Sequence, residues 1–228
     1  SAASDVYKRQ IYNMMNLEKF DWNQEHIITH RLSESVIAAA GIGKLDDSEI
    51  FVEHPKYKKY YVSQYGRVIS LKRKGVKLLG AFIGGQPDRQ YMYYGFTQDG
   101  ETKTIGMHRA VADTFCPNFW KNKHLEAHHI DGDKMNNNYR NLILLTTELH
   151  SAIHKIKKIV LLADGQIREY RNPLDLVRDT GLTLEDILLA NKGKKKPVKS
   201  RGKFTVFDIK GHLIGFQYYP EKDQKKKK

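Results

Sequence analysis

Four histidines and an asparagine in one short stretch of this chain are the residues best suited to chemistry. His128 and His129 are adjacent, Asn141 follows, and His150 and His154 are separated by three residues. Histidine and asparagine pack poorly in cores, so packing alone does not explain this density. A neutral imidazole nitrogen can bind a metal, and one with a pKa near ~6.5 can accept a proton at neutral pH. The combination is typical of a metal-dependent hydrolytic site.

The spacing of these residues separates their roles. Adjacent residues on a strand point to opposite faces, so His128 and His129 cannot play the same part. One is expected to bind the metal and the other to face the attacking water. On a helix, His150 and His154 would lie on one side, one turn apart, as two metal ligands require. Asn141 could hold a backbone carbonyl or a histidine in place, or bind the metal through its amide oxygen.

The segment His128-His129-Ile130-Asp131-Gly132, Asn141-Leu142 and the distal histidines resemble the HNH, or ββα-metal, nucleases. In that fold two strands and a helix hold one divalent ion. The resemblance implies that His129 is the general base and that His128 is the first metal ligand, where many relatives carry aspartate. Asn141 matches the central asparagine. His150 and His154 match a distal pair that toxin nucleases use for metal and for the scissile phosphate.

The resemblance therefore implies a catalytic set and a metal-binding set that overlap. One divalent ion is expected, with Mg²⁺ or Mn²⁺ as the first choice. Zn²⁺ is possible, because a site rich in histidine suits transition ions and carboxylate sites suit Mg²⁺. The catalytic set is His128, His129 and Asn141, and the metal set is His128, Asn141, His150 and His154.

The elements that position this site are expected to come from both sides of it. A helix beginning near Met107 and carrying Val111, Ala112 and Phe115 precedes the cluster, with short strands before it at 77–79 and 91–94. His108-Arg109 matches the segment that precedes the site in phage homing-type members. His108 is interpreted as structural or as a phosphate contact, with a catalytic role as the alternative.

Upstream, Tyr61-Val62-Ser63-Gln64-Tyr65-Gly66-Arg67-Val68 resembles a small module found in nucleases of this kind. It predicts two strands around a tight turn that presents polar and basic side chains. The alternative is a half-buried strand with a solvated basic face. The side chains expected to contact phosphates here are Arg67, Lys72, Arg73 and Lys74, together with Arg109 from the later helix.

Downstream, residues 174–180 and 184–189 predict two short helices joined at Gly181, flanked by hairpins at 156–170 and 204–218. The helices resemble the helix-turn-helix repeat of intron-encoded nucleases, whose second helix can enter a major groove. The basic stretch 192–203 is a solvated loop or a clamp on the DNA backbone. Its expected contacts are Lys192, Lys194, Lys195 and Lys196.

Composition limits the partners. The chain has 228 residues, a net charge of +13 and one cysteine, Cys116. The charge favours a polyanion. The lone cysteine excludes an internal disulfide and fits a reducing cytoplasm, and no apolar run is long enough to span a bilayer. We expect double-stranded DNA and no membrane as partner, a monomer with a dimer not excluded, and a phage or mobile element in a prokaryotic host as source.

These patterns predict an α+β, modular chain: a central ββα-metal (His-Me finger) nuclease domain between a small β-rich module and a helix-turn-helix module. The first ten residues resemble the read-through peptide that adapter contamination leaves in predicted sequences, so the native N-terminus is expected to be missing. The predicted segments are 1–10 (not native), 11–48 (helical), 49–80 (strand-rich module), 81–156 (nuclease domain), 157–210 (helix-turn-helix-like module) and 211–228 (terminal strand and basic tail).

The predicted function is that of a homing-type endonuclease that hydrolyses phosphodiester bonds in double-stranded DNA. A single site per chain predicts a nick from a monomer and a double-strand break only from a dimer. The alternative is a catalytically inactive, sequence-specific DNA-binding protein that retains the nuclease fold. An RNA-directed nuclease has no support in the sequence, because the stacking signature of the common RNA modules is missing.

Overall fold

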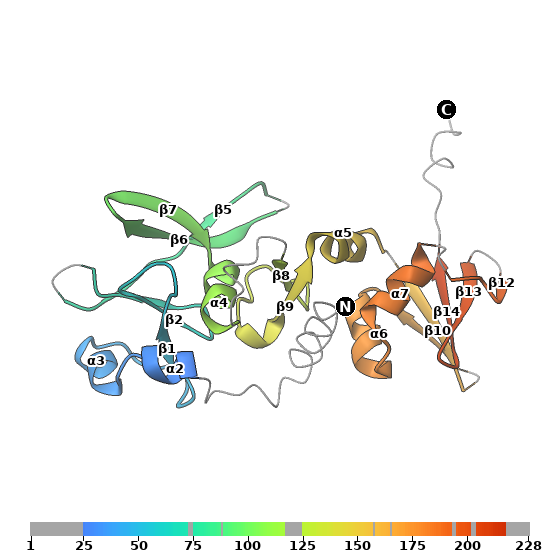
Figure 1. Cartoon of the computed structure of the whole chain (residues 1–228), viewed down its shortest axis with the longest axis horizontal. Helices are drawn as coiled ribbons and strands as arrows, with labels where there is room; N and C mark the ends of the chain where they lie inside the picture. Colours follow the sequence, from blue (N-terminus) through green and yellow to red (C-terminus); the bar gives the residue numbers. More distant parts are fainter. Residues whose placement is uncertain are drawn as a thin grey trace. The chain divides into compact units, whose positions relative to one another are not determined.

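The structure, a computed structural model, divides the chain into two compact units, Ser1–Leu145 and Thr146–Lys228. Each unit combines helices and sheets, as the expected α+β class requires (Figure 1). The described residues are 25–72, 75–87, 89–116, 125–156, 158–164, 166–192, 195–201 and 204–217. The predictions for residues 1–10, for the first part of the 11–48 segment, for Arg73, Lys74 and Lys194, and for the terminal lysines lie outside these residues.

Two short helices open the described part of the first unit, α2 (Glu25–His30) and α3 (Glu34–Ala39). The predicted helical pattern is interrupted between them, where the backbone pairs with a strand: Leu32 N donates to Phe51 O at 2.7 Å. The apolar positions that predicted one continuous helix are therefore divided between α2 and α3 and the segment that joins them. They contribute to a small buried cluster of Leu32, Ile37, Phe51 and Ile69.

A four-stranded antiparallel sheet follows in the order β1-β2-β3-β4. The predicted turn at Ser63–Gly66 joins its two central strands. Gly66 has φ +89°, and a Cβ there would lie 2.7 Å from Met107 Sδ and 3.3 Å from Asn137 Cβ. Only glycine fits such a close approach with that backbone angle. The strands are β1 (Phe51–Glu53), β2 (Tyr60–Ser63), β3 (Val68–Ser70) and β4 (Lys77–Leu78).

The next sheet has the order β5-β6-β7 and leads directly into the predicted helix. Residues 91–94 were expected to form a strand, but β7 was missed although Asp99-Gly100 is a hairpin signal. Both residues have positive φ, 53° and 81°, as a primed two-residue turn requires. The elements are β5 (Phe82–Gly84), β6 (Tyr91–Gln98), β7 (Glu101–Gly106) and α4 (Met107–Phe115).

One buried cluster joins the first sheet to the site-bearing strands. It contains Val62 and Val68 from the first sheet, Val111 and Phe115 from α4, and Leu142. The strand-rich segment 49–80 therefore shares its core with the expected nuclease domain. The remaining elements of the first unit are β8 (Leu125–His129), the 3₁₀ turn η3 (Tyr139–Asn141) and β9 (Leu142–Thr146), where β8 and β9 form a two-stranded sheet.

The second unit begins with α5 and has a five-stranded sheet in the order β11-β10-β14-β13-β12. The two predicted helices occur, and Gly181 between them has φ +66°. Strand β14 pairs with both β10 and β13, so the predicted boundary between 210 and 211 would divide one hairpin. The elements are α5 (Thr147–Lys155), β10 (Ile159–Ala163), β11 (Gln166–Tyr170), α6 (Pro173–Thr180), α7 (Leu184–Asn191), β12 (Lys199–Arg201), β13 (Phe204–Ile209) and β14 (His212–Gln217).

Among the described residues, every helix is too short or too polar to cross a membrane.

Candidate active site

The side chain of His129 is held by Asn137 at the end of β8. His129 Nε2 lies 3.1 Å from Asn137 Oδ1, and both residues are buried. The amide orientation follows from its other contact, since Asn137 Nδ2 donates to the carbonyl of Met135 at 3.0 Å. Because a carbonyl only accepts, Oδ1 faces the imidazole and Nε2 carries the hydrogen. This tautomer leaves Nδ1 of His129 as the unprotonated nitrogen.

Aromatic rings surround the same imidazole. The ring centroids of His108 and Tyr91 lie 5.3 Å and 6.2 Å from that of His129. Burial lowers the pKa of His129, and the bond with Asn137 offsets this shift only in part. A neutral imidazole at neutral pH is the form that a general base needs. The structure therefore brings His108 to the expected base as a packing neighbour.

Asn141 closes the loop between β8 and β9. Its Oδ1 accepts from the backbone N of Asp131 at 3.1 Å, and its Nδ2 donates to Asp131 Oδ1 and Asn136 O at 2.8 Å each. Burial alone would raise the pKa of Asp131, but the hydrogen bonds from Asn141 and Asn136 hold it below its usual value. The alternative in which Asn141 holds the backbone is the one these bonds favour. That Asn141 binds metal stays a prediction.

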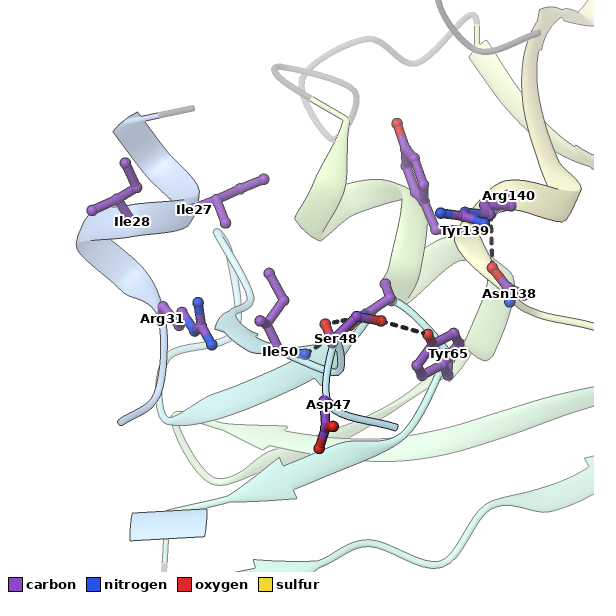
Figure 2. A pocket seen from close by; sticks show the side chains of 11 residues that line it. Ile27, Ile28, Arg31, Asp47, Ser48, Ile50, Tyr65, Asn138, Tyr139 and Arg140 are labelled. Carbon is purple, nitrogen blue, oxygen red and sulfur yellow. Dashed lines mark hydrogen bonds between the residues drawn. The ribbon is translucent and has the colours of Figure 1, made fainter. Parts of the chain in front are cut away.

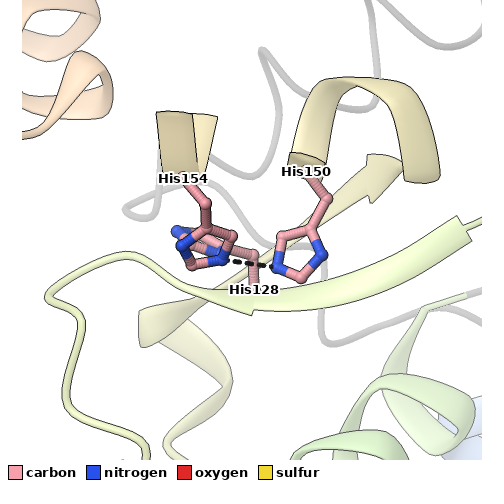
Figure 3. Close-up of side chains that lie close together, drawn as sticks. All are labelled: His128, His150 and His154. Atoms are coloured by element: carbon pink, nitrogen blue, oxygen red, sulfur yellow. Dashed lines mark hydrogen bonds between the residues drawn. The ribbon is translucent and has the colours of Figure 1, made fainter. Parts of the chain in front are cut away.

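His150 and His154 lie one turn apart on α5, as their spacing predicted (Figure 3). Their Nε2 atoms are 3.1 Å apart. Two imidazole nitrogens bound to one ion at ~2.0–2.1 Å in tetrahedral geometry would be about 3.3 Å apart. The spacing thus suits either an imidazole donating to its neighbour or a shared cation. His150 is half-buried and His154 is exposed.

His128 precedes His129 on β8, so it extends from the other face of that strand. It is 8% exposed. Strand β8 pairs with β9, and Thr146 at the end of β9 is the N-cap of α5, where its hydroxyl accepts from Leu149 N at 3.3 Å. The chain therefore runs without a loop from the partner strand of His128 into the helix that carries His150 and His154.

Arg67, which the sequence predicts to contact phosphate, makes contacts within the first unit. Its Nε donates to Glu49 Oε1 at 3.0 Å, its Nη2 contacts Glu49 Oε2, and Nη2 also donates to Gly43 O at 2.8 Å. Glu49 is fully buried. A buried carboxylate must be paired, so Arg67 stabilises the packing of this unit, and its phosphate contact stays a prediction.

Most of the predicted turn of the upstream module is buried, and its Tyr65 is half-buried. Ser63 and Gln64 are 0% and 4% exposed. The Gln64 side chain accepts from Ile50 N and donates to Ser48 O, and the backbone carbonyl of Gln64 accepts from Tyr139 N at 2.7 Å. The turn therefore supports the loop that carries the site.

Of the other predicted DNA contacts, two are hydrogen-bonded to carboxylates of the protein. Arg109 Nε donates to Asp113 Oδ1 at 2.9 Å, and Lys195 Nζ donates to Asp186 Oδ1 at 2.9 Å. These bonds compete with phosphate binding. Lys72, Lys192 and Lys196 are exposed, and their phosphate contacts stay predictions.

A cleft of about 350 Å³ lies beside the 3₁₀ turn of the first unit (Figure 2). It is lined by Ile27 from α2, by Arg31 just after that helix, by Tyr65, and by Asn138 and Arg140. Asn138 Oδ1 accepts from Arg140 N at 2.9 Å, which caps the turn. No sequence pattern indicated this cleft, because its walls come from four separate segments of the chain.

Asn137 and Tyr91 are the functional candidates that sequence reasoning missed. Asn137 lies within the conspicuous run Asn136–Asn138, so its type was visible but its contact with His129 was not. Tyr91 was assigned only to a strand. Nothing in the sequence distance between residues 91 and 129 indicates that their rings meet.

Comparison with known proteins gives two curated relatives. The H-N-H endonuclease F-TflII of Escherichia phage T5 is 32% identical over 102 residues, which is 45% of this chain and 50% of that protein. An uncharacterized HNH endonuclease of Acanthamoeba polyphaga mimivirus is 31% identical over 147 residues, 60% of this chain and 42% of that protein. The chain spans about half the length, or less, of these curated relatives.

A solved structure described as "DNA binding and cleavage by the HNH homing endonuclease I-HmuI" is 25% identical, with a TM-score of 0.38. The match covers 75% of this chain and 99% of that one. No family model matches the chain. The chain is thus similar to HNH endonucleases of phage and mimivirus, and this similarity supports an endonuclease.

Proposed function

We propose that the chain is a metal-dependent DNA endonuclease of the homing type that hydrolyses phosphodiester bonds in double-stranded DNA. The observation that carries the proposal is the bond between His129 and Asn137, which sets the tautomer of a buried imidazole. The similarity to HNH endonucleases supports the reaction class. The net charge of +13 supports a polyanionic substrate.

His129 is the general base in this proposal. Its Nδ1 takes a proton from water as the water oxygen forms a bond to phosphorus and the bond from phosphorus to the leaving oxygen breaks. Asn137 is a positioning residue, because it keeps the hydrogen on Nε2 and fixes the ring. Tyr91 and His108 shield the ring from solvent, which keeps the imidazole neutral.

His128, His150 and His154 would hold one divalent metal ion. The fit rests on the donor set and on the 3.1 Å spacing of the two Nε2 atoms on α5. A bound divalent ion supplies charge neutralisation at the phosphate and at the leaving oxygen. Three imidazoles suit Zn²⁺ or another transition ion better than Mg²⁺, so the metal preference is part of the test.

The second unit would contribute to finding the DNA. Helices α6 and α7 have the lengths and the glycine turn that a helix-turn-helix needs. The exposed Lys192 and Lys196 follow α7 and can contact the backbone.

The test is cleavage of supercoiled plasmid with Mg²⁺, Mn²⁺ or Zn²⁺ by the wild type, by His129→Ala and by a control, His30→Ala, which alters an exposed histidine of the same unit. We expect His129→Ala to lose at least about a hundredfold in rate while keeping DNA affinity. The control should cleave like the wild type. Cleavage that survives in His129→Ala would remove the base assignment. Binding without cleavage in every metal would favour the inactive DNA-binding protein.

A further inference from the structure

Helix α5 has a second polar face besides the one with the histidines. Residues Ser151 and Lys155 lie four apart on that face. At 100° per residue, the direction of Ser151 and Lys155 lies about 100° around the helix from the direction of His150 and His154. The proposed metal ligands therefore leave this face unused.

This second face lines a cleft of about 500 Å³ within the second unit. The opposite wall is the C-terminal end of α7, with Leu188, Asn191 and Lys192. Helices α5 and α7 pack against one another there. Lys192 is the first residue of the basic stretch that the sequence indicated as a backbone clamp, so the fold brings the start of that stretch to the histidine-bearing helix.

The chemistry of the cleft fits an anion. Its lining carries the ammonium groups of Lys155 and Lys192, the hydroxyls of Thr147 and Ser151, and the amide of Asn191, against the single carboxylate of Glu148. Ammonium, hydroxyl and amide groups are the donors that proteins use for phosphate oxygens. Ser151, Lys155, Asn191 and Lys192 are all exposed, so a duplex can reach them.

We propose that the cleft between α5 and α7 binds a backbone phosphate of the DNA duplex, with Lys155 and Lys192 as its main contacts. The inference rests on the proposed function for the identity of the polyanion. Helix α5 would then hold the DNA on one face and the metal on an adjacent face. A phosphate bound there fixes the duplex relative to His150 and His154 by a rigid helix of nine residues.

The experiment measures binding of a labelled duplex by fluorescence anisotropy, in EDTA, over a series of salt concentrations. The test variant is Lys155→Gln/Lys192→Gln. The control Lys158→Gln/Lys210→Asn removes the same charge from the same unit outside the cleft; asparagine suits the positive φ of Lys210. Thermal unfolding of both variants shows whether they are folded.

We expect the test variant to bind about tenfold more weakly and its salt slope to fall by about 1, as loss of one phosphate contact predicts. Ser151→Asp, which places a carboxylate in the cleft, should weaken binding similarly. The control should stay within about twofold of the wild type.

Equal slopes and affinities for the test variant and the control would overturn the inference, as would a wild type that does not bind duplex DNA. Failure of the proposed function is distinguishable, because a wild type that binds DNA with the expected slopes and never cleaves it removes the nuclease proposal alone.

Discussion

Asn137 Oδ1 lies 3.1 Å from His129 Nε2, and this contact decides which nitrogen of the proposed base is available. The amide cannot be turned round without placing its oxygen against the carbonyl of Met135. A buried side chain outside the expected catalytic set thus controls the chemistry of one inside it.

We expect Asn137→Ala to lower the cleavage rate about 10- to 100-fold with little change in DNA affinity, because the imidazole loses its orientation but the DNA contacts remain. Single-turnover cleavage and anisotropy binding separate the two effects. The matched control is Asn138→Ala, the neighbouring asparagine, whose side chain caps Arg140 N. Equal rates for the two variants would contradict the positioning role.

Asn141→Ala should destabilise the protein by about 1–3 kcal/mol, because it removes three hydrogen bonds that close the loop at Asp131. Denaturant unfolding without metal measures this cost. A control, Asp131→Asn, keeps an acceptor for Asn141. Metal titration followed by thermal shift tests the other prediction: unchanged stability with a more than tenfold loss of metal affinity would make Asn141 a ligand.

Arg67→Ala should lower the free energy of unfolding by about 3–5 kcal/mol, because it leaves the carboxylate of Glu49 buried and unpaired. The exposed Lys72→Ala should cost less than about 0.5 kcal/mol. Chemical denaturation compares the two. A stable Arg67→Ala protein with a reduced salt slope for DNA binding would contradict this structural role and support the phosphate contact that the sequence predicted.

The buried pair of His54 and Asp113 gives opposing dependences of stability on pH. Burial lowers the pKa of His54 to about 3, so its contribution is present above pH 6.5 and is lost as pH falls toward 3. Burial raises the pKa of Asp113 to about 6, so its contribution is present below pH 3.8 and is lost as pH rises toward 6. Between pH 4 and 6 the two slopes, each about 1.4 kcal/mol per pH unit, oppose one another.

Replacing one residue of this pair should leave only the pH dependence of stability that the other residue causes. In His54→Asn, which keeps an acceptor for Lys56 N and Tyr57 N, the free energy of unfolding should rise, relative to wild type, as pH falls from 6 to 4. In Asp113→Asn it should fall over the same range. Urea unfolding at pH 4, 5 and 6 measures both, and curves parallel to the wild type would contradict the assignment.

The sequence by itself determined the local elements and the types of the chemical groups. Apolar periodicity and the position of Gly181 predicted α6 and α7. The three-residue gap placed His150 and His154 on one side of α5, because helix geometry depends on neighbours in the chain. The expected roles of the histidines rested on type and order alone, which is why the metal and its ligands remain proposals.

Only the tertiary structure decided which polar side chains are used for the fold. Arg67 looked like a phosphate contact, but residue 49 lies opposite it and buries a carboxylate that needs a partner. In the sequence, Asn137 is one of three consecutive asparagines, and only the fold shows that its side chain contacts His129 at the end of β8. Such pairings depend on long-range packing, which sets burial and therefore the cost of an unpaired polar group. A sequence pattern shows the group and not the partner that will satisfy it.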